Sequence, residues 1–286
     1  MRADPTVAEW LKGWPDLFPT RCSPATLRHD AYMVAPFIRR YGKRRLAEFA
    51  PLEAQAWAVR HPGHVRYLRR AWSKALLMEI VTFNVWRVVE LPPRANPPRP
   101  VPTDAELEVI LARCRGRGGW WLEYADLIDF AAHTGSRSGG LAGLRRTDVD
   151  LKRRRAVLTE KGAKVRRVAL PGRAAVALER QLERRPWMAP LALVWRAQRR
   201  GPLDRDRIGE AWRAVRGDFS GPFHSLRHYA ATWLDAQGIS ERDIAIQMGW
   251  TDSMGRPRVR ELRSVYVHPS HEDALERVEL ACADRL

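Results

Sequence analysis

Four side chains between residues 137 and 227 could together act on a phosphodiester. His224 and Arg227 stand three residues apart, so on a helix both would address one phosphate. Arg137 follows a predicted helix end, where its planar guanidinium could project into a cleft and bind two phosphate oxygens. Lys161 stands at the tip of a predicted hairpin, in a chain with only six lysines against 44 arginines.

The motif content favours a route that uses neither metal nor ATP. The sequence has no His-Glu-x-x-His, no clustered carboxylates for two-metal catalysis and no P-loop. Phosphodiester chemistry without metal requires a side-chain nucleophile, fixed cations on the phosphate oxygens, and proton donors and acceptors. Each candidate alone also fits a solvated helix face or turn, so only their combination is informative.

The net charge indicates a polyanionic partner. The 286 residues include 50 Lys and Arg against 33 Asp and Glu, a formal net charge of +17. A protein of this size with such an excess usually meets nucleic acid, and an acidic membrane surface is the weaker alternative. Codon bias explains arginine in place of lysine, but it does not create the excess. We therefore expect double-stranded DNA as the partner.

The composition excludes several classes of protein. With 45% hydrophobic and 29% charged residues, the chain can build packed cores. Its three cysteines, Cys22, Cys114 and Cys282, are odd in number and far apart, which argues against a disulfide scaffold. No apolar run approaches the ~18 residues of a membrane span, and the N-terminus lacks the apolar core of a signal peptide. These features predict a cytoplasmic protein with no membrane partner.

A proline-rich stretch divides the chain into two predicted domains. Residues 91–102 contain six prolines in twelve positions, which disfavour helix and sheet and favour a semi-rigid linker. Residues 1–90 read as helical, with helices predicted over 25–41, 51–60 and 64–89.

The predicted second domain, residues 103–286, is mostly helical with one small sheet. It opens with a capping box formed by Thr103 and Glu106. Strand-like runs at 156–158 and 165–170 predict a hairpin around the two lysines of its turn, Lys161 and Lys164. A helix is predicted over 120–133, and a short helix follows it and ends at residue 144. Further helices are predicted over 173–185, 205–216, 224–237, 241–248 and 271–283. The expected fold class is therefore mainly α with a small β-sheet.

Five ordered segments resemble the tyrosine recombinase (phage integrase) family in its simple two-domain form. The segment HTGSRSGGLAGLRRTDVDL is similar to the first-arginine box, LTEKGAKVRRVALP to the β-hairpin lysine box, and FHSLRHYAATWL to the H-x-x-R box. MGW aligns with the L-G-H box, and SVYVHPS with the tyrosine box. The first domain is similar to the family's helical core-binding domain, which clamps DNA.

The resemblance implies a role for each matching residue. Tyr266 would attack the scissile phosphate and form a 3′-phosphotyrosyl link. Arg137 and Arg227 would hold the non-bridging oxygens, Lys161 would protonate the leaving 5′-oxygen, and His224 would act as acid or base toward the tyrosine. The implied activity is site-specific cutting and rejoining of DNA by a homotetramer on two paired sites, without cofactors.

Three positions depart from the family pattern. Trp250 stands where the family usually has histidine, and its indole can donate a hydrogen bond but cannot exchange a proton at neutral pH. Gly140 stands where the family commonly has Glu or Asp, so a supporting carboxylate is expected to be missing near Arg137. Tyr266 follows Trp250 by 16 residues, several more than usual.

Other readings of the sequence remain open. Residues 230–250 also scan as a helix-turn-helix with a turn at Gly238 and a cap at Ser240, which fits a DNA-binding regulator. A recombinase-like protein that binds but does not cut, and a topoisomerase of the same chemistry, are the further alternatives.

Overall fold

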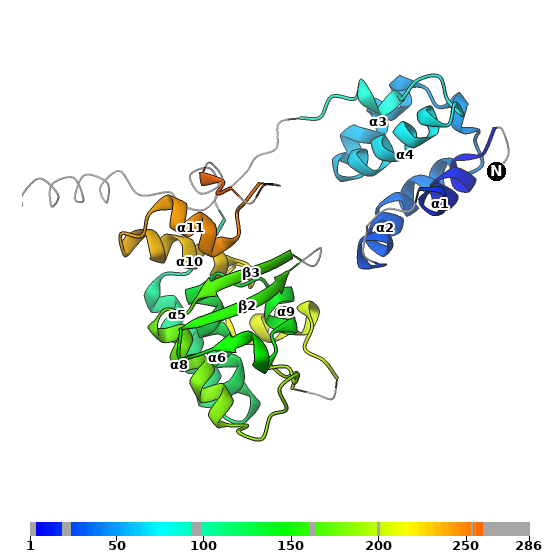
Figure 1. Cartoon of the computed structure of the whole chain (residues 1–286). Helices are drawn as coiled ribbons and strands as arrows, with labels where there is room; N and C mark the ends of the chain where they lie inside the picture. Colours follow the sequence, from blue (N-terminus) through cyan, green and yellow to red (C-terminus); the bar gives the residue numbers. More distant parts are fainter. Residues whose placement is uncertain are drawn as a thin grey trace, which may run out of the picture. The chain divides into compact units, whose positions relative to one another are not determined.

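The structure is a computed structural model that describes residues 4–18, 24–92, 99–160, 164–198, 201–252, 254 and 256–259. The chain divides into two compact units, Met1–Pro97 and Pro98–Leu286. The division falls within the proline-rich stretch, of which residues 93–98 lie outside the described part. Helices dominate both units, and the second also contains a small antiparallel sheet (Figure 1), which confirms the expected fold class.

The first unit is a set of helices around an aromatic core. It contains α1 (Val7–Leu17), α2 (Pro24–Tyr41), α3 (Pro51–Arg60) and α4 (Val65–Leu77), with 3₁₀ turns at Leu46–Glu48, Pro62–His64 and Val85–Arg87. The fully buried Phe37 ring lies 5.1 to 6.0 Å from four other rings, those of Phe49, Trp57, Trp72 and Trp86. Such edge-to-face contacts add to the burial of large apolar surfaces.

The predicted long helix over 64–89 is wrong in its second half. Helix α4 ends at Leu77, and Glu79 then adopts a left-handed backbone with φ of 55°. The fully buried Asn84 amide donates to the Arg69 carbonyl at 2.9 Å, so the chain folds back along α4. The left-handed Glu79 and the buried Asn84 therefore end the helix, although the apolar residues beyond it keep helical spacing. Helix α1, which was not predicted, begins at a Thr6 capping box.

The second unit combines helices with a three-stranded sheet. Its helices are α5 (Asp104–Arg117), α6 (Trp120–Thr134), α7 (Ser138–Gly143), α8 (Gly172–Glu183), α9 (Arg205–Val215), α10 (Ser225–Ala236) and α11 (Glu241–Met248), with a 3₁₀ turn at Arg146–Asp148. The strands β1 (Val149–Asp150), β2 (Arg155–Glu160) and β3 (Lys164–Ala169) pair in that order.

The predicted hairpin is confirmed, and so are the helices of this unit up to residue 248, to within a few residues at their ends. Strand β1 was not predicted, and α9 begins at Arg205 as predicted. Residues 161–163 at the hairpin tip and the predicted helix over 271–283 lie outside the described residues.

Helix α6 is the buried centre of the second unit and packs against α5, α8 and α10. It carries three buried acidic residues, and an unpaired buried carboxylate is strongly destabilising. Arginines from neighbouring segments neutralise them, in the pairs Glu123–Arg196 (2.5 Å), Asp126–Arg184 (2.5 Å) and Asp129–Arg173 (3.0 Å). Because these ion pairs neutralise its buried charges, α6 can pack in the interior against α10.

Within the described residues, no helix combines the length and the apolar composition that crossing a bilayer requires.

We predict that Gly135→Ala destabilises the second unit by about 1–3 kcal/mol, because Gly135 has a left-handed φ of 65° and an added Cβ would lie 2.3 Å from the Met248 sulfur. The control is Gly116→Ala in α5, where nothing lies within 4 Å of the added Cβ, and it should stabilise by about 0.5–1 kcal/mol. Thermal unfolding compares the two, and equal shifts would contradict the packing described.

Candidate active site

Arg227 is a fully buried cation on which separate segments converge. It lies in the first turn of α10, with 1% of its surface exposed. Its guanidinium donates to the Gly135 carbonyl at 2.5 Å and to the Met248 carbonyl. It also lies 5.3 Å from the centroid of the Trp250 ring. These contacts tie the ends of α6 and α11 to α10 and fix the orientation of a positive charge that carbonyl oxygens do not neutralise.

Arg137 is placed by the turn that ends α6. The buried Thr134 hydroxyl donates to the Phe130 carbonyl at 2.6 Å and lies 2.6 Å from the Ser136 hydroxyl. This fixes the backbone between the left-handed Gly135 and the start of α7, where Arg137 is the N-cap residue. The Arg137 side chain is 36% exposed, so part of the guanidinium faces solvent.

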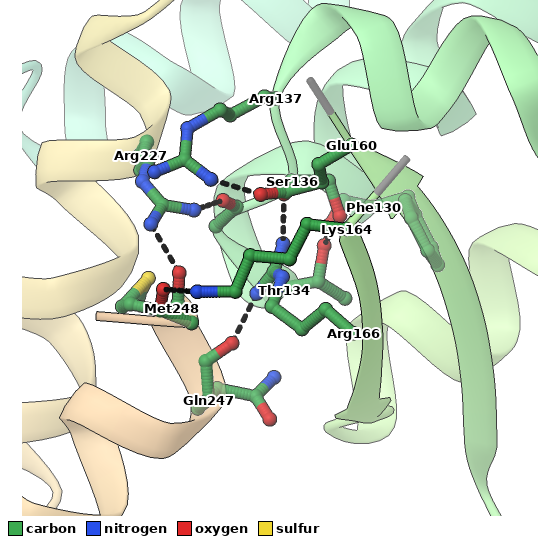
Figure 2. A network of polar contacts seen from close by, with 12 residues as sticks. Phe130, Thr134, Ser136, Arg137, Glu160, Lys164, Arg166, Arg227, Gln247 and Met248 are labelled. Atoms are coloured by element: carbon green, nitrogen blue, oxygen red, sulfur yellow. Dashed lines mark hydrogen bonds and ion pairs between the residues drawn. The ribbon is translucent and has the colours of Figure 1, made fainter. Parts of the chain in front are cut away.

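A buried carboxylate holds the other side of the Arg137 guanidinium. Glu160, the last residue of β2, accepts from Arg137 with one oxygen and from Arg166 at 2.9 Å with the other. Arg166 also donates to the Gln247 carbonyl at the end of α11. Figure 2 shows these side chains together, with Arg227 beside Arg137. The expectation that a supporting carboxylate is missing near Arg137 is therefore wrong, since Glu160 supplies it.

His224 lies in the same electrostatic environment as both arginines. It is the N-cap residue of α10 and is half-buried. Burial lowers the pKa of His224 to about 4, and the positive charges of Arg227 and Arg137 act in the same direction. The imidazole is therefore neutral at pH 7 and able to accept a proton. Because both charges reach this ring, the structure brings together three of the residues that the sequence singled out.

Trp250 completes the described part of this cluster. Its ring is 4% exposed and forms a cation–π contact with Arg227. The Trp250 backbone N–H donates to the Ala245 carbonyl at 2.8 Å, which holds the residue beside the end of α11. At this position the indole orients the buried guanidinium through its face.

Two of the predicted residues, Lys161 and Tyr266, lie outside the described residues. The neighbouring Lys164 is described: its ammonium donates to the Thr251 hydroxyl at 2.7 Å and the Gly249 carbonyl at 3.4 Å. The start of β3 is thereby tied to the segment that follows α11.

The long segment between Trp250 and Tyr266 begins with a loop that closes on itself. Thr251 pairs with Pro257, and the Arg258 N–H donates to the Trp250 carbonyl at 2.7 Å. The chain is therefore back beside Trp250 at Arg258, and Tyr266 follows Arg258 by eight residues in the sequence.

Sequence reasoning missed Glu160, Arg166 and Gln247. The burial of β2 alternates, with Ala156, Leu158 and Glu160 pointing inward. An acidic residue at an inward position of a strand that ends beside a candidate lysine was the available signal.

Comparisons with known proteins identify the family of this chain. Residues 103–268 match the phage integrase family, and because this is more than half of the chain, the chain belongs to that family. It is 33% identical to the tyrosine recombinase XerC of Corynebacterium efficiens over 155 residues, which are 52% of this chain and 47% of that protein. The chain thus spans about half the length of this curated relative.

The fold is shared with solved integrases. The Tn1549 transposon integrase in complex with a circular intermediate DNA superposes with a TM-score of 0.73 at 17% identity, over 96% of this chain and 99% of that one. A lambda integrase tetramer bound to a Holliday junction gives a TM-score of 0.73 at 17% identity, over 94% and 80% of the two chains. At this identity the likeness establishes the fold.

We predict that His224 weakens the fold in acid. Its pKa of about 4 in the folded protein lies below the ordinary value of about 6.5 in the unfolded chain, so between these values the unfolded chain binds more protons. Its contribution to stability is present above pH ~6.5 and is lost as the pH falls toward 4. Urea unfolding at pH 7 and pH 5 should show a smaller loss for His224→Asn than for the wild type. The same loss in both proteins would mean that this histidine is not desolvated.

Proposed function

We propose that this protein is a site-specific DNA recombinase that cuts and rejoins double-stranded DNA through a 3′-phosphotyrosyl intermediate, without metal or ATP. The observation that carries the proposal is the convergence of Arg137, from the turn between α6 and α7, with His224 and Arg227, from the start of α10. Two oriented guanidinium groups beside a neutral imidazole fit a phosphate that gains negative charge during reaction.

In this proposal the arginines bind the scissile phosphate. Arg137 and Arg227 contact its non-bridging oxygens and stabilise the charge of the pentavalent transition state. Arg227 is held rigidly by the carbonyls of Gly135 and Met248, so little reorganisation is needed when the phosphate arrives. Trp250 keeps the guanidinium in place by packing on its face.

Tyr266 and Lys161 supply the nucleophile and the acid. The Tyr266 phenol oxygen forms a bond to phosphorus while the bond to the 5′-oxygen breaks, which leaves the DNA 3′-phosphate on the tyrosine. Lys161 gives a proton to the leaving oxygen, and neutral His224 takes the phenol proton. A second DNA 5′-hydroxyl then reverses the step, and because the number of phosphoester bonds is conserved, no external energy source is required.

The assembly is proposed by analogy with the neighbours. The lambda integrase structure is a tetramer on a Holliday junction, and the Tn1549 integrase is bound to DNA. We expect this chain to act as a homotetramer on two paired sites, with residues 1–90 as a core-binding domain and 103–286 as the catalytic domain. With a net charge of +17, DNA binding should weaken steeply with salt.

We predict that wild-type protein forms a covalent adduct with DNA and that Tyr266→Phe does not. The probe is a pool of nicked duplexes with a random core, so that the fragment released by cleavage diffuses away and traps the intermediate. SDS-resistant complexes are recovered and their DNA is sequenced, which also reveals the preferred site.

The matched control is Tyr229→Phe. The buried Tyr229 hydroxyl donates to the Asp104 carboxylate at 2.7 Å, and burial raises the pKa of this phenol, so it should not be a nucleophile. Tyr229→Phe should still form the adduct. Equal non-covalent retention of DNA by wild type and Tyr266→Phe would favour the DNA-binding regulator, and plasmid relaxation without site preference would favour a topoisomerase.

A further inference from the structure

We infer that Glu160 is a positioning residue that holds Arg137 for the scissile phosphate, and that Gly140 leaves the room this carboxylate needs. The inference rests on the proposed function, because it concerns the same phosphate site. The carboxylate that supports Arg137 then comes from the end of β2, and not from α7, where the family pattern places it.

Glu160 divides its two oxygens between two arginines. Its side chain is only 4% exposed, so it is largely removed from water. One oxygen accepts from Arg137, and the other accepts from Arg166 at 2.9 Å. Charge-assisted bonds of this kind are about twice as strong as neutral ones. The carboxylate therefore immobilises one side of the Arg137 guanidinium and leaves its other donors for a ligand.

Arg166 in turn keeps Glu160 from moving. The Arg166 side chain is 4% exposed and donates to the Gln247 carbonyl. The Gln247 amide clamps the backbone of Ala169 in β3, with bonds of 2.9 and 3.0 Å. An added Cβ on Gly249 would lie 2.5 Å from the Arg166 side chain, which shows how closely α11 approaches it. Figure 2 shows this chain of contacts from Arg137 through Glu160 to the end of α11.

Gly140 lies against the Glu160 side chain. It is buried in α7, three residues after Arg137, on the same helical face. A Cβ at this position would lie 3.6 Å from Glu160 Cγ and 3.6 Å from Leu158 Cβ, which is ordinary contact. A longer side chain would compete with Glu160 for the same space. Conversely, removal of the Glu160 side chain should leave room for a carboxylate carried by residue 140.

The contact between Glu160 and Arg137 should affect the rate of adduct formation more than the affinity for DNA. A free arginine side chain samples many rotamers, and misplacement of a catalytic group by about 1 Å can cost a factor of about 100. DNA affinity instead sums many phosphate contacts, so one misoriented guanidinium changes it little.

The experiment measures single-turnover adduct formation on the duplex that the wild type selects. Glu160→Gln and Glu160→Ala should slow the step by about 10- to 100-fold with DNA affinity changed less than about threefold. The double variant Gly140→Glu/Glu160→Ala supplies the carboxylate from residue 140 in the space that Glu160 vacates, and it should regain at least tenfold over Glu160→Ala.

The matched control is Glu123→Gln. Glu123 is also a buried carboxylate shared by two arginines, Arg196 and Arg185, but it lies at the opposite end of α6 from Gly135. Its loss should lower the melting temperature as Glu160→Gln does and leave the rate unchanged. Thermal unfolding of every variant separates loss of fold from loss of rate.

Several results would overturn the inference. Unchanged rates in both Glu160 variants would do so, as would an equal slowing by Glu123→Gln. A double variant that folds as stably as Glu160→Ala but shows no recovery would mean that Glu160 is merely structural. Failure of the wild type itself to form an adduct would instead overturn the proposed function.

Discussion

The buried guanidinium of Arg227 is the interaction on which the catalytic unit depends. A charge removed from water is costly unless polar groups surround it, and here the carbonyls of Gly135 and Met248 and the face of Trp250 do so. Those groups come from the end of α6, the end of α11 and the segment that follows α11. The positive charge thus requires that these distant segments meet, and their meeting creates the site.

The proposed phosphate site brings together arginines that repel one another, and only some of this positive charge is offset by a carboxylate. Glu160 lies between Arg137 and Arg166 and offsets part of their charge, whereas Arg227 is oriented by neutral carbonyls. The excess positive charge then acts on His224, whose pKa falls to about 4 through burial and these charges. The ring is left neutral at pH 7, as a proton acceptor must be. One set of contacts therefore accounts for both the proposed anion site and the neutral imidazole beside it.

Much of the fold and part of the site could be predicted from the sequence, for identifiable reasons. The capping box at Thr103 and the helix-ending Gly135 are local signals, and the structure follows them. Ordered motifs around Arg137, His224 and Arg227 indicated residues that the fold brings together. Glu160 was missed because its pairing with Arg137 spans 23 residues and depends on how β2 packs on α7. The helix over 64–89 was overextended because helical spacing carries no information about a left-handed residue such as Glu79.

The central claim is that one phenol becomes bonded to a DNA phosphate. Nuclease digestion of the protein–DNA adduct, followed by proteolysis and mass spectrometry, identifies the residue that carries the remaining nucleotide. We expect a single modified peptide that contains Tyr266, with the nucleotide joined through its 3′-phosphate. A nucleotide on any other residue, or one joined through a 5′-phosphate, would contradict it.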